Sequence, residues 1–188
     1  MSTPLIVSEF VTVDGVVEAP GGEPTHPHAG WALDFAGEEQ MQYKLREVQE
    51  AGSLLLGRVT YDGFAAAWPD REGEFADKMN AMPKHVVTSS RTTPLEWNNS
   101  TVITGDIATG IRALKEQDGA PILVAGSATL VPFLLEQGLV DELRLMVFPV
   151  AVGGGKRCFP DNQSKQTFSL ADSVAFPSGV AVHTYRPA

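Results

Sequence analysis

The feature that most constrains this chain is an alternation of short apolar runs with segments of helical spacing. The apolar runs predict strands over residues 4–13, 53–58, 84–90, 100–104 and 121–126. The segments between and after them predict helices over residues 37–52, 59–68, 77–82, 107–119 and 128–138, the last with Pro132 in its first turn. Beyond residue 138 only strands are expected, over 141–152 and in a terminal hairpin around Pro177-Ser178-Gly179. This order predicts an α/β sheet that is mostly parallel, with an antiparallel C-terminal edge.

Length and charge narrow the class of protein. With 188 residues, 43% of them hydrophobic, we expect one domain over residues 1–188. The net charge of -9 argues against nucleic acid and anionic membranes as partners. No apolar run reaches the ~18 residues of a membrane span, and the start of the chain lacks the pattern of a secretory signal. We therefore expect a cytoplasmic protein.

The stretch EFVTVDGVVEAP, residues 9–20, has two interpretations. Apolar residues alternate on both sides of Asp14-Gly15, a dipeptide typical of the type I′ hairpin turn, which needs φ > 0 at both central positions. The same letters also fit a strand that ends in a ligand-binding loop, because a long Pro- and Gly-rich segment follows over residues 18–30. The residues alone leave both interpretations open.

Several predicted strands end in small or hydroxyl residues just before a helix: LLLGRVT, VVTSSR, VITGD and ILVAGSAT. The carboxyl ends of parallel strands share one edge of a sheet, where helix N-termini attract phosphates. Gly126-Ser127 would let the backbone approach a pyrophosphate, and Arg58 and Arg91 would supply charge for a further phosphate. Neither a G-x-G-x-x-G fingerprint after a strand nor a phosphate-binding G-x-x-x-x-G-K-[ST] motif occurs. The pattern favours a long phosphorylated cofactor bound outside an ordinary dinucleotide fold.

The ordered motifs LLLGRVTYDGF, VVTSSR and ILVAGSATLVPFLLEQGLVDELRLMVFPVAVGGGKRCFP resemble the dihydrofolate reductase-like fold. They are most similar to its branch that contains the reductase domain of bacterial riboflavin biosynthesis, the RibD C-terminal domain, and the likeness covers nearly the whole chain. The resemblance implies a three-layer α/β/α domain that binds NADPH along the strand ends. It also implies a homodimer, for which residues 143–152 are the candidate interface.

Site residues follow from the same resemblance. Val13, Gly15 and Val16 are expected beside the nicotinamide, together with Asp14, which would orient the substrate or a water. The remaining expected cofactor contacts are Gly57, Arg58 and Thr60 at the phosphates, Ser89, Ser90 and Arg91 at the 2′-phosphate and adenosine, and Gly126, Ser127, Ala128 and Thr129 at the pyrophosphate.

The chemistry expected is hydride transfer from NADPH to a small conjugated heterocycle, or to a carbonyl or imine, of the pteridine or pyrimidine kind. Asp34 and Glu38 are the candidate proton donors, and Trp31 and Glu18 the candidate substrate contacts, with Glu18 also able to aid proton delivery. His26 and His28 share a loop without a cysteine or carboxylate cluster, so no metal site is expected. The alternative is a non-catalytic nucleotide-binding or interaction module with the same fold, which retention of the cofactor would test.

Overall fold

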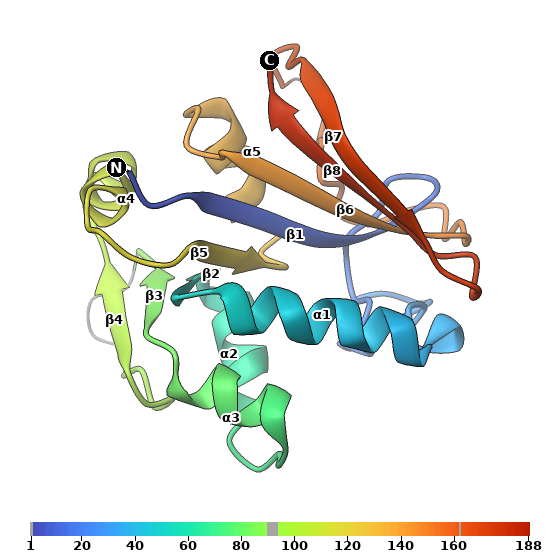
Figure 1. Ribbon diagram of the computed structural model, residues 1–188, viewed down its shortest axis with the longest axis horizontal. Coiled ribbons are helices and arrows are strands. Elements are labelled where there is room, and N and C mark those ends of the chain that lie inside the picture. Colours follow the sequence, from blue (N-terminus) through green and yellow to red (C-terminus); the bar gives the residue numbers. More distant parts are fainter. Residues whose placement is uncertain (1, 90–93, 162) are drawn as a thin grey trace.

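The computed structural model describes residues 2–89, 94–161 and 163–188. Its centre is one sheet with the strand order β4-β3-β2-β5-β1-β6-β8-β7 (Figure 1). The strands are β1 (Leu5–Thr12), β2 (Ser53–Gly57), β3 (Lys84–Val87), β4 (Ser100–Ile103), β5 (Ile122–Ala125), β6 (Glu142–Phe148), β7 (Phe168–Ala175) and β8 (Ala181–Pro187). All pairs from β4 to β6 are parallel, whereas β6–β8 and β8–β7 are antiparallel. The mixed sheet with an antiparallel C-terminal edge is confirmed.

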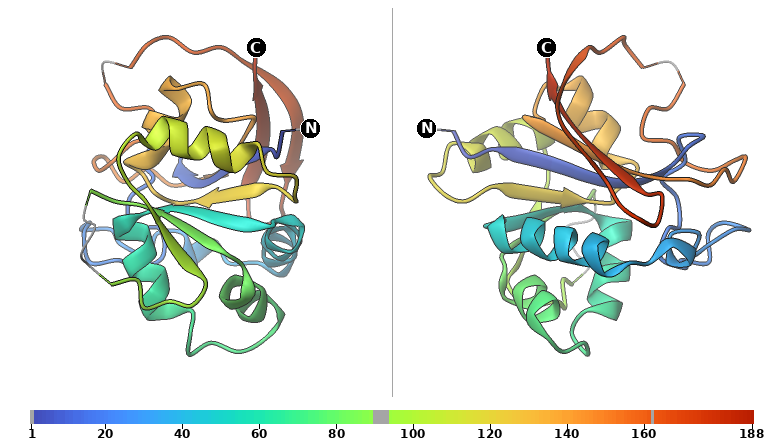
Figure 2. Two further views of the ribbon diagram at one scale, coloured as in Figure 1. Left: turned by 90° about the vertical axis from the view of Figure 1, so that its left-hand side faces the viewer. Right: turned by 45° about the vertical axis from the view of Figure 1, so that its right-hand side comes forward.

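Helices cover both faces of the parallel part of the sheet, as Figure 2 shows. They are α1 (Glu38–Glu50), α2 (Arg58–Ala67), α3 (Glu74–Ala81), α4 (Ile107–Lys115) and α5 (Leu130–Glu136), with a short 3-10 turn, η1 (Leu33–Phe35). Residues of α4 and α5 pack on one face, in a core cluster with Leu5, Val7 and Leu143. Residues of α1, α2 and α3 pack on the other face around Leu54 and Leu56. The two layers hold the parallel strands rigidly from both sides.

Local signals explain where several elements begin. Asp106 caps α4, because its carboxylate accepts the backbone N–H of Thr109 at 3.1 Å. Pro132 lies in the first turn of α5, where a missing N–H costs little. Helix α3 begins at Glu74, three residues before the predicted start, because Gly73 adopts φ 100° and releases the chain into the helix there.

The segment proposed as a dimer interface includes a central strand of the sheet. Strand β6 lies inside the sheet between β1 and β8, and its Leu143 and Phe148 side chains are fully buried. Its apolar character reflects burial on both faces within one chain. The edges of β6 are therefore covered by β1 and β8, and the interface prediction for residues 143–152 stays a prediction.

Candidate active site

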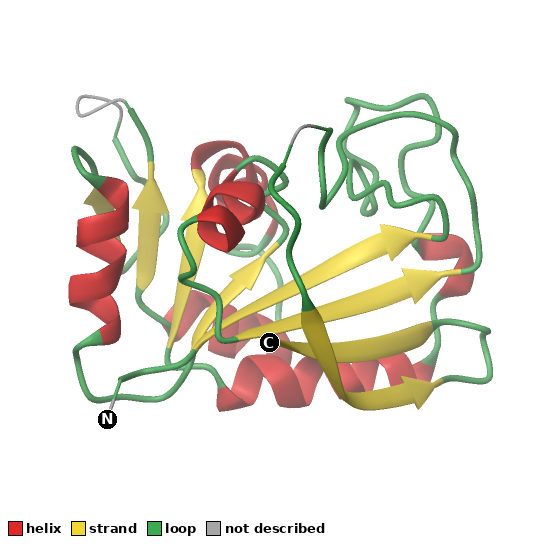
Figure 3. Cartoon of the chain, turned by 90° about the horizontal axis from the view of Figure 1, so that it is seen from above, coloured by secondary structure: helices red, strands yellow, loops and turns green. Residues whose placement is uncertain are grey.

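The strand order creates an opening between β1 and β5. Strand β1 pairs with β5 only over Leu5–Ser8, although it pairs with β6 as far as Thr12. Figure 1 shows β5 ending well short of β1, and Figure 3 shows the strands fanning apart toward their carboxyl ends. From β1 the chain continues through α1 to β2, and from β5 it continues through α5 to β6 on the opposite side. Such a switch point in an open α/β sheet leaves a crevice where ligands bind.

A cleft of about 1620 Å³ occupies this crevice. The ends of β2 and β5 form one part of its wall, and an apolar part comes from α2 and α3. The loop that follows β1 closes a further side with residues between Val17 and Thr25. The cofactor contacts expected from the sequence that line this cleft are Gly57, Arg58, Thr60, Ser89, Gly126, Ser127, Ala128 and Thr129. Ser90 and Arg91 lie outside the described residues.

Hydrogen bonds lock the ends of β2 and β5 together. The backbone N–H of Gly57 donates to Ser127 Oγ at 3.0 Å, and the N–H of Ser127 donates to Thr60 Oγ1 at 2.9 Å. Gly126 and Ser127 both adopt positive φ, 68° and 71°, and for serine this is an uncommon conformation. Strained backbone of this kind clusters at ligand sites. The loop therefore presents backbone, without side-chain bulk, to the cleft.

Arg58 begins α2 beside this loop. Its Nε donates to Asp62 at 3.0 Å, and this hydrogen bond raises the pKa of Arg58. Its Nη1 is buried and has no hydrogen-bond partner among the described residues. Because Gly57 offers no side-chain cap, the first N–H groups of α2 also stay available. The wall here combines a free cationic donor with a helix N-terminus, which suits an anionic group.

The Asp14-Gly15 stretch forms a turn that is not type I′. Only Gly15 has positive φ, 87°, and its N–H donates to the Thr12 carbonyl at 2.9 Å. The Asp14 carboxylate accepts from Thr12 Oγ1 at 2.5 Å and from the N–H of Gly153 at 2.8 Å. These two bonds lower the pKa of Asp14, the first of them most. Asp14 thus fastens the turn to the loop after β6.

The residues expected beside the nicotinamide do not reach the cleft. Val13 is 62% exposed, Val16 is fully buried, and neither they nor Asp14 and Gly15 line the cavity. Val17 and Glu18, just beyond, do line it. The loop therefore enters the cleft later in the sequence than the resemblance implied, because the turn at 12–16 first redirects the chain alongside Lys156 and Arg157.

Three other residues that were expected to act in catalysis or to bind substrate, Trp31, Asp34 and Glu38, also lie away from the cleft. Trp31 is 3% exposed, donates from Nε1 to the Glu18 carbonyl at 2.8 Å and packs edge-on against Phe148, so it is a core residue. Asp34 and Glu38 are exposed and do not line the cleft. The aromatic wall comes instead from Trp68, which stacks on Phe75 with ring centroids 5.1 Å apart.

Glu9 lines the cleft, although no motif in the sequence singled it out. It lies on β1, is 2% exposed and lines the cleft, and its Oε1 has no hydrogen-bond partner among the described residues. A signal was available, because the period of two along β1 places Glu9 on the same face as Leu5, Val7 and Val11, which are core residues. Among buried apolar residues, a carboxyl group is rare unless it has an ion-pair or hydrogen-bond partner or a functional role.

Cys158 and the histidines carry no separate site. Burial, with Glu9 adding to it, raises the pKa of the Cys158 thiol far above its usual range, so the thiol stays protonated and inert. His26 Nε2 contacts the Gly154 carbonyl at 2.7 Å. Within residues 2–89, 94–161 and 163–188, no three His, Cys, Asp or Glu side chains are grouped as metal ligands. In the same residues, no helix is long and apolar enough to span a bilayer.

Comparison with known proteins agrees with this geometry. The model of the RibD C-terminal domain family matches residues 3–182. The chain belongs to this family. It is 28% identical over 191 residues to YyaP, an uncharacterized protein of Bacillus subtilis (strain 168), with 97% of this chain and 94% of YyaP covered.

Solved structures show the same fold for this RibD C-terminal domain. A putative riboflavin biosynthesis protein from Shewanella sp. PV-4 matches with a TM-score of 0.76 at 20% identity, covering 100% of this chain and 99% of that one. Dihydrofolate reductase from Enterococcus faecalis, complexed with NADP(H), matches with a TM-score of 0.63 at 15% identity, covering 100% and 99%. The expected family and the dihydrofolate reductase-like fold are confirmed.

Proposed function

We propose that this protein is an NADPH-dependent reductase that acts on a small conjugated heterocycle, carbonyl or imine of the pteridine or pyrimidine kind. The observation that carries the proposal is the locked pair of strand ends, where Gly57, Thr60 and Ser127 hold strained, side-chain-poor backbone against a large cleft. A binding site for a long phosphorylated cofactor needs such close backbone approach. Membership in a family of reductase domains supports the same activity.

The residues present fit the cofactor. The unpartnered Nη1 of Arg58 would pair with a phosphate oxygen, and a Cβ on Gly126 would stand 3.3 Å from Thr60 Cγ2, a tight contact at a position whose positive φ already favours glycine. Ser89, Ala128 and Thr129 complete this part of the wall. We assign Ser90 and Arg91 to the 2′-phosphate as a proposal from the resemblance alone. NADPH, when bound, supplies the hydride.

The protein's own contribution is to position the acceptor and exclude water. Phe64, Trp68, Phe75 and Met79 form the apolar wall against which a flat, conjugated ring would lie. The loop between Val17 and Thr25 covers a further side. Glu18 is partly fixed in this loop, because its carboxylate accepts the N–H of Lys156 at 3.0 Å. A rigid wall and a covering loop together favour a near-attack geometry.

Oxidation of NADPH tests the activity directly. Loss of the nicotinamide absorbance is followed with pteridines, pyrimidines and simple imines or ketones as acceptors. Thr60→Val should lower the rate about fivefold at subsaturating NADPH, because a lost hydrogen bond costs about 1 kcal/mol. Thr101→Val, on β4 outside the cleft, is the matched control and should keep the wild-type rate. Tight NADPH binding without turnover of any acceptor would favour the non-catalytic module instead.

A further inference from the structure

Among the described residues, Glu9 is the one buried acid that lines the cleft, and its interpretation rests on the proposed reductase function. It is the first residue of β1 beyond the last pair with β5, Ser8↔Ala125, so its backbone lies at the point where the crevice opens. Its side chain is buried yet lines the cleft, and Oε1 has no partner among the described residues. A buried carboxyl without a hydrogen bond costs free energy, so its retention calls for a role.

Two titratable groups act on Glu9, and neither forms an ion pair with it. Lys44 of α1 lies on the cleft wall, but its ammonium group pairs with Glu47 and donates to Ser8 Oγ at 2.9 Å. Cys158, from the segment after β6, stays a neutral thiol because burial raises its pKa. Burial also raises the pKa of Glu9 well above its ordinary value, and the Lys44 charge offsets only part of this rise. The carboxyl therefore holds its proton at a pH where an exposed glutamate has lost it.

We propose that Glu9 is the acid that protonates the acceptor during reduction. For a C=N acceptor, the carbon gains the hydride of the reduced nicotinamide. The π electron pair of the C=N bond takes the proton of Glu9 to form the N–H bond. Glu9 becomes a carboxylate that the nearby Lys44 charge stabilises, and a solvent proton restores it. The acceptor gains two electrons and two hydrogens, and NADPH becomes NADP⁺.

The other carboxylates near the cleft fit this role less well. Glu23 and Glu72 line the cleft but are exposed. Asp34 and Glu38 are exposed and do not line the cleft. The Glu18 carboxylate lines it but accepts the Lys156 N–H. A general acid must reach the substrate and hold its proton near the working pH. Among these carboxylates, only Glu9 meets both requirements.

The ionisation of Glu9 is measured first, because it needs no substrate. Side-chain carboxyl carbons are labelled with ¹³C in glutamate, and the NADPH complex is titrated by NMR. The signal that Glu9→Gln removes should remain in its protonated position at pH 7. An ionised Glu9 at pH 7 in that complex would overturn the inference. Failure of the wild type to bind NADPH would instead contradict the proposed function.

Kinetics then separate proton donation from a structural or binding role, with 7,8-dihydropterin as the cyclic imine probe. Glu9→Gln should lower kcat by roughly 10²–10⁴-fold, leave the Kd of NADPH within about twofold, and abolish the fall in rate at alkaline pH. Asp34→Asn, the same acid-to-amide change outside the cleft, should keep the wild-type profile. A rise in KM with unchanged kcat would show that Glu9 only binds substrate, and an unchanged pH profile would also overturn the proposal.

Discussion

Asp14 and Glu9 lie five residues apart on the same segment and have opposite environments. Asp14 is hydrogen-bonded by a side chain and by the backbone of the loop after β6, whereas Glu9 is buried with a free oxygen. The sequence drew attention to Asp14 because Asp-Gly is a strong turn signal. The strand periodicity that singles out Glu9 is a weaker signal than the Asp-Gly pair. A charged residue within an apolar row is informative only once that face of the strand is known to be buried.

Replacing Asp14 by alanine should affect stability and not cofactor binding. The carboxylate holds the turn at residues 12–16 to the loop containing Val152 and Gly153. Its pKa is lowered in the folded protein, mainly by the Thr12 hydroxyl, so its contribution is present above its ordinary pKa of 3.8 and is lost as the pH falls through the lowered value. Thermal unfolding should show a lower Tm for Asp14→Ala at pH 7, and a smaller difference from wild type at acid pH. A loss of NADPH affinity with an unchanged Tm would contradict this assignment.

Lys84 gives a pH dependence in the alkaline range. It is fully buried on β3, donates from Nζ to the Asn80 and Asn98 carbonyls at 2.6 and 3.1 Å, and lies over the Trp97 ring. Burial lowers its pKa from 10.5 to about 8, so between these values the unfolded chain binds more protons than the folded protein. The free energy of unfolding should therefore rise with pH across that window by at most about 3 kcal/mol relative to Lys84→Met. Denaturant titrations from pH 7 to 10.5 measure this, and the exposed Lys165→Met should match wild type throughout.

At the scale of elements, the alternation of strands and helices was predictable, because each element carried its own signals. The apolar runs, the Gly stops and the position of Pro132 fixed the element types and most bounds. The role of β6 was not predictable in this way. An apolar strand has the same sequence pattern whether a second chain covers it or strands β1 and β8 do. Only the strand order in the sheet distinguishes these two cases.

The junction of β5 with α5 yields a prediction with a matched control. Gly126 and Gly138 flank α5 and both have positive φ, 68° and 60°, where alanine is strained by about 1–2 kcal/mol. Alanine at either position should lower the free energy of unfolding by that amount. Only Gly126→Ala should also weaken NADPH binding, because Gly126 lines the cleft and Gly138 does not. Equal NADPH affinities in the two variants would contradict the placement of the cofactor at this loop.

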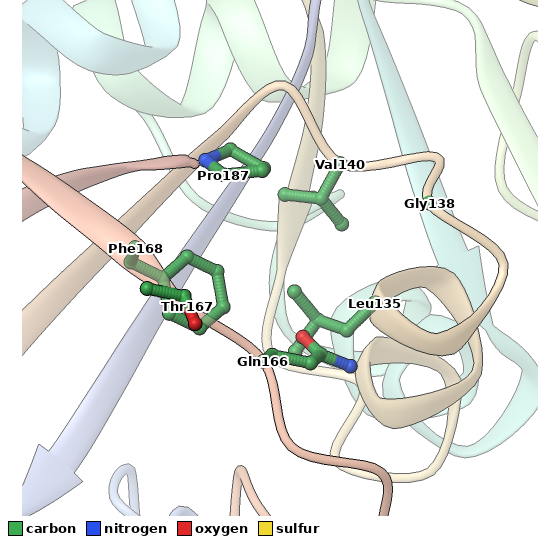
Figure 4. A pocket seen from close by; sticks show the side chains of 7 residues that line it. All are labelled: Leu135, Gly138, Val140, Gln166, Thr167, Phe168 and Pro187. Atoms are coloured by element: carbon green, nitrogen blue, oxygen red, sulfur yellow. The ribbon is translucent and has the colours of Figure 1, made fainter.

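Across the whole molecule, the cleft and a smaller cavity differ in the chemical groups that line them. The smaller one, about 230 Å³, lies where α5 leads into β6 and where β7 begins (Figure 4). Leu135, Val140 and Phe168 give it an apolar lining, and none of the described residues that line it is charged. The large cleft combines backbone donors, Arg58 and an unpaired acid at the switch point of the sheet. The sequence placed the strand ends there, but it could not show which loop residues enter the cleft.

Residues at the strand ends line the cleft as expected, whereas several residues of the loop after β1 do not, and this difference has a physical cause. Residues at strand ends are positioned by the sheet register, which follows from local patterns. The strand-end pattern therefore pointed to Gly126 and Ser127, the family resemblance added Gly57 and Thr60, and all four line the cleft. Residues after β1 are positioned by long-range bonds, such as Val17 N–H to the Lys156 carbonyl at 2.9 Å, between segments more than a hundred residues apart. No local signal encodes such a contact, which is why Val13 and Trp31 were misplaced.

Binding of NADPH in the cleft is tested most directly by a calorimetric titration of the purified protein with NADPH, with NADH and FMN as controls. We expect saturable binding of NADPH, weaker binding of NADH, which lacks the 2′-phosphate, and a marked loss of NADPH affinity in Gly126→Ala. No heat of binding with NADPH, or equal affinity for FMN, would contradict the assignment of the cleft to a reduced nicotinamide cofactor.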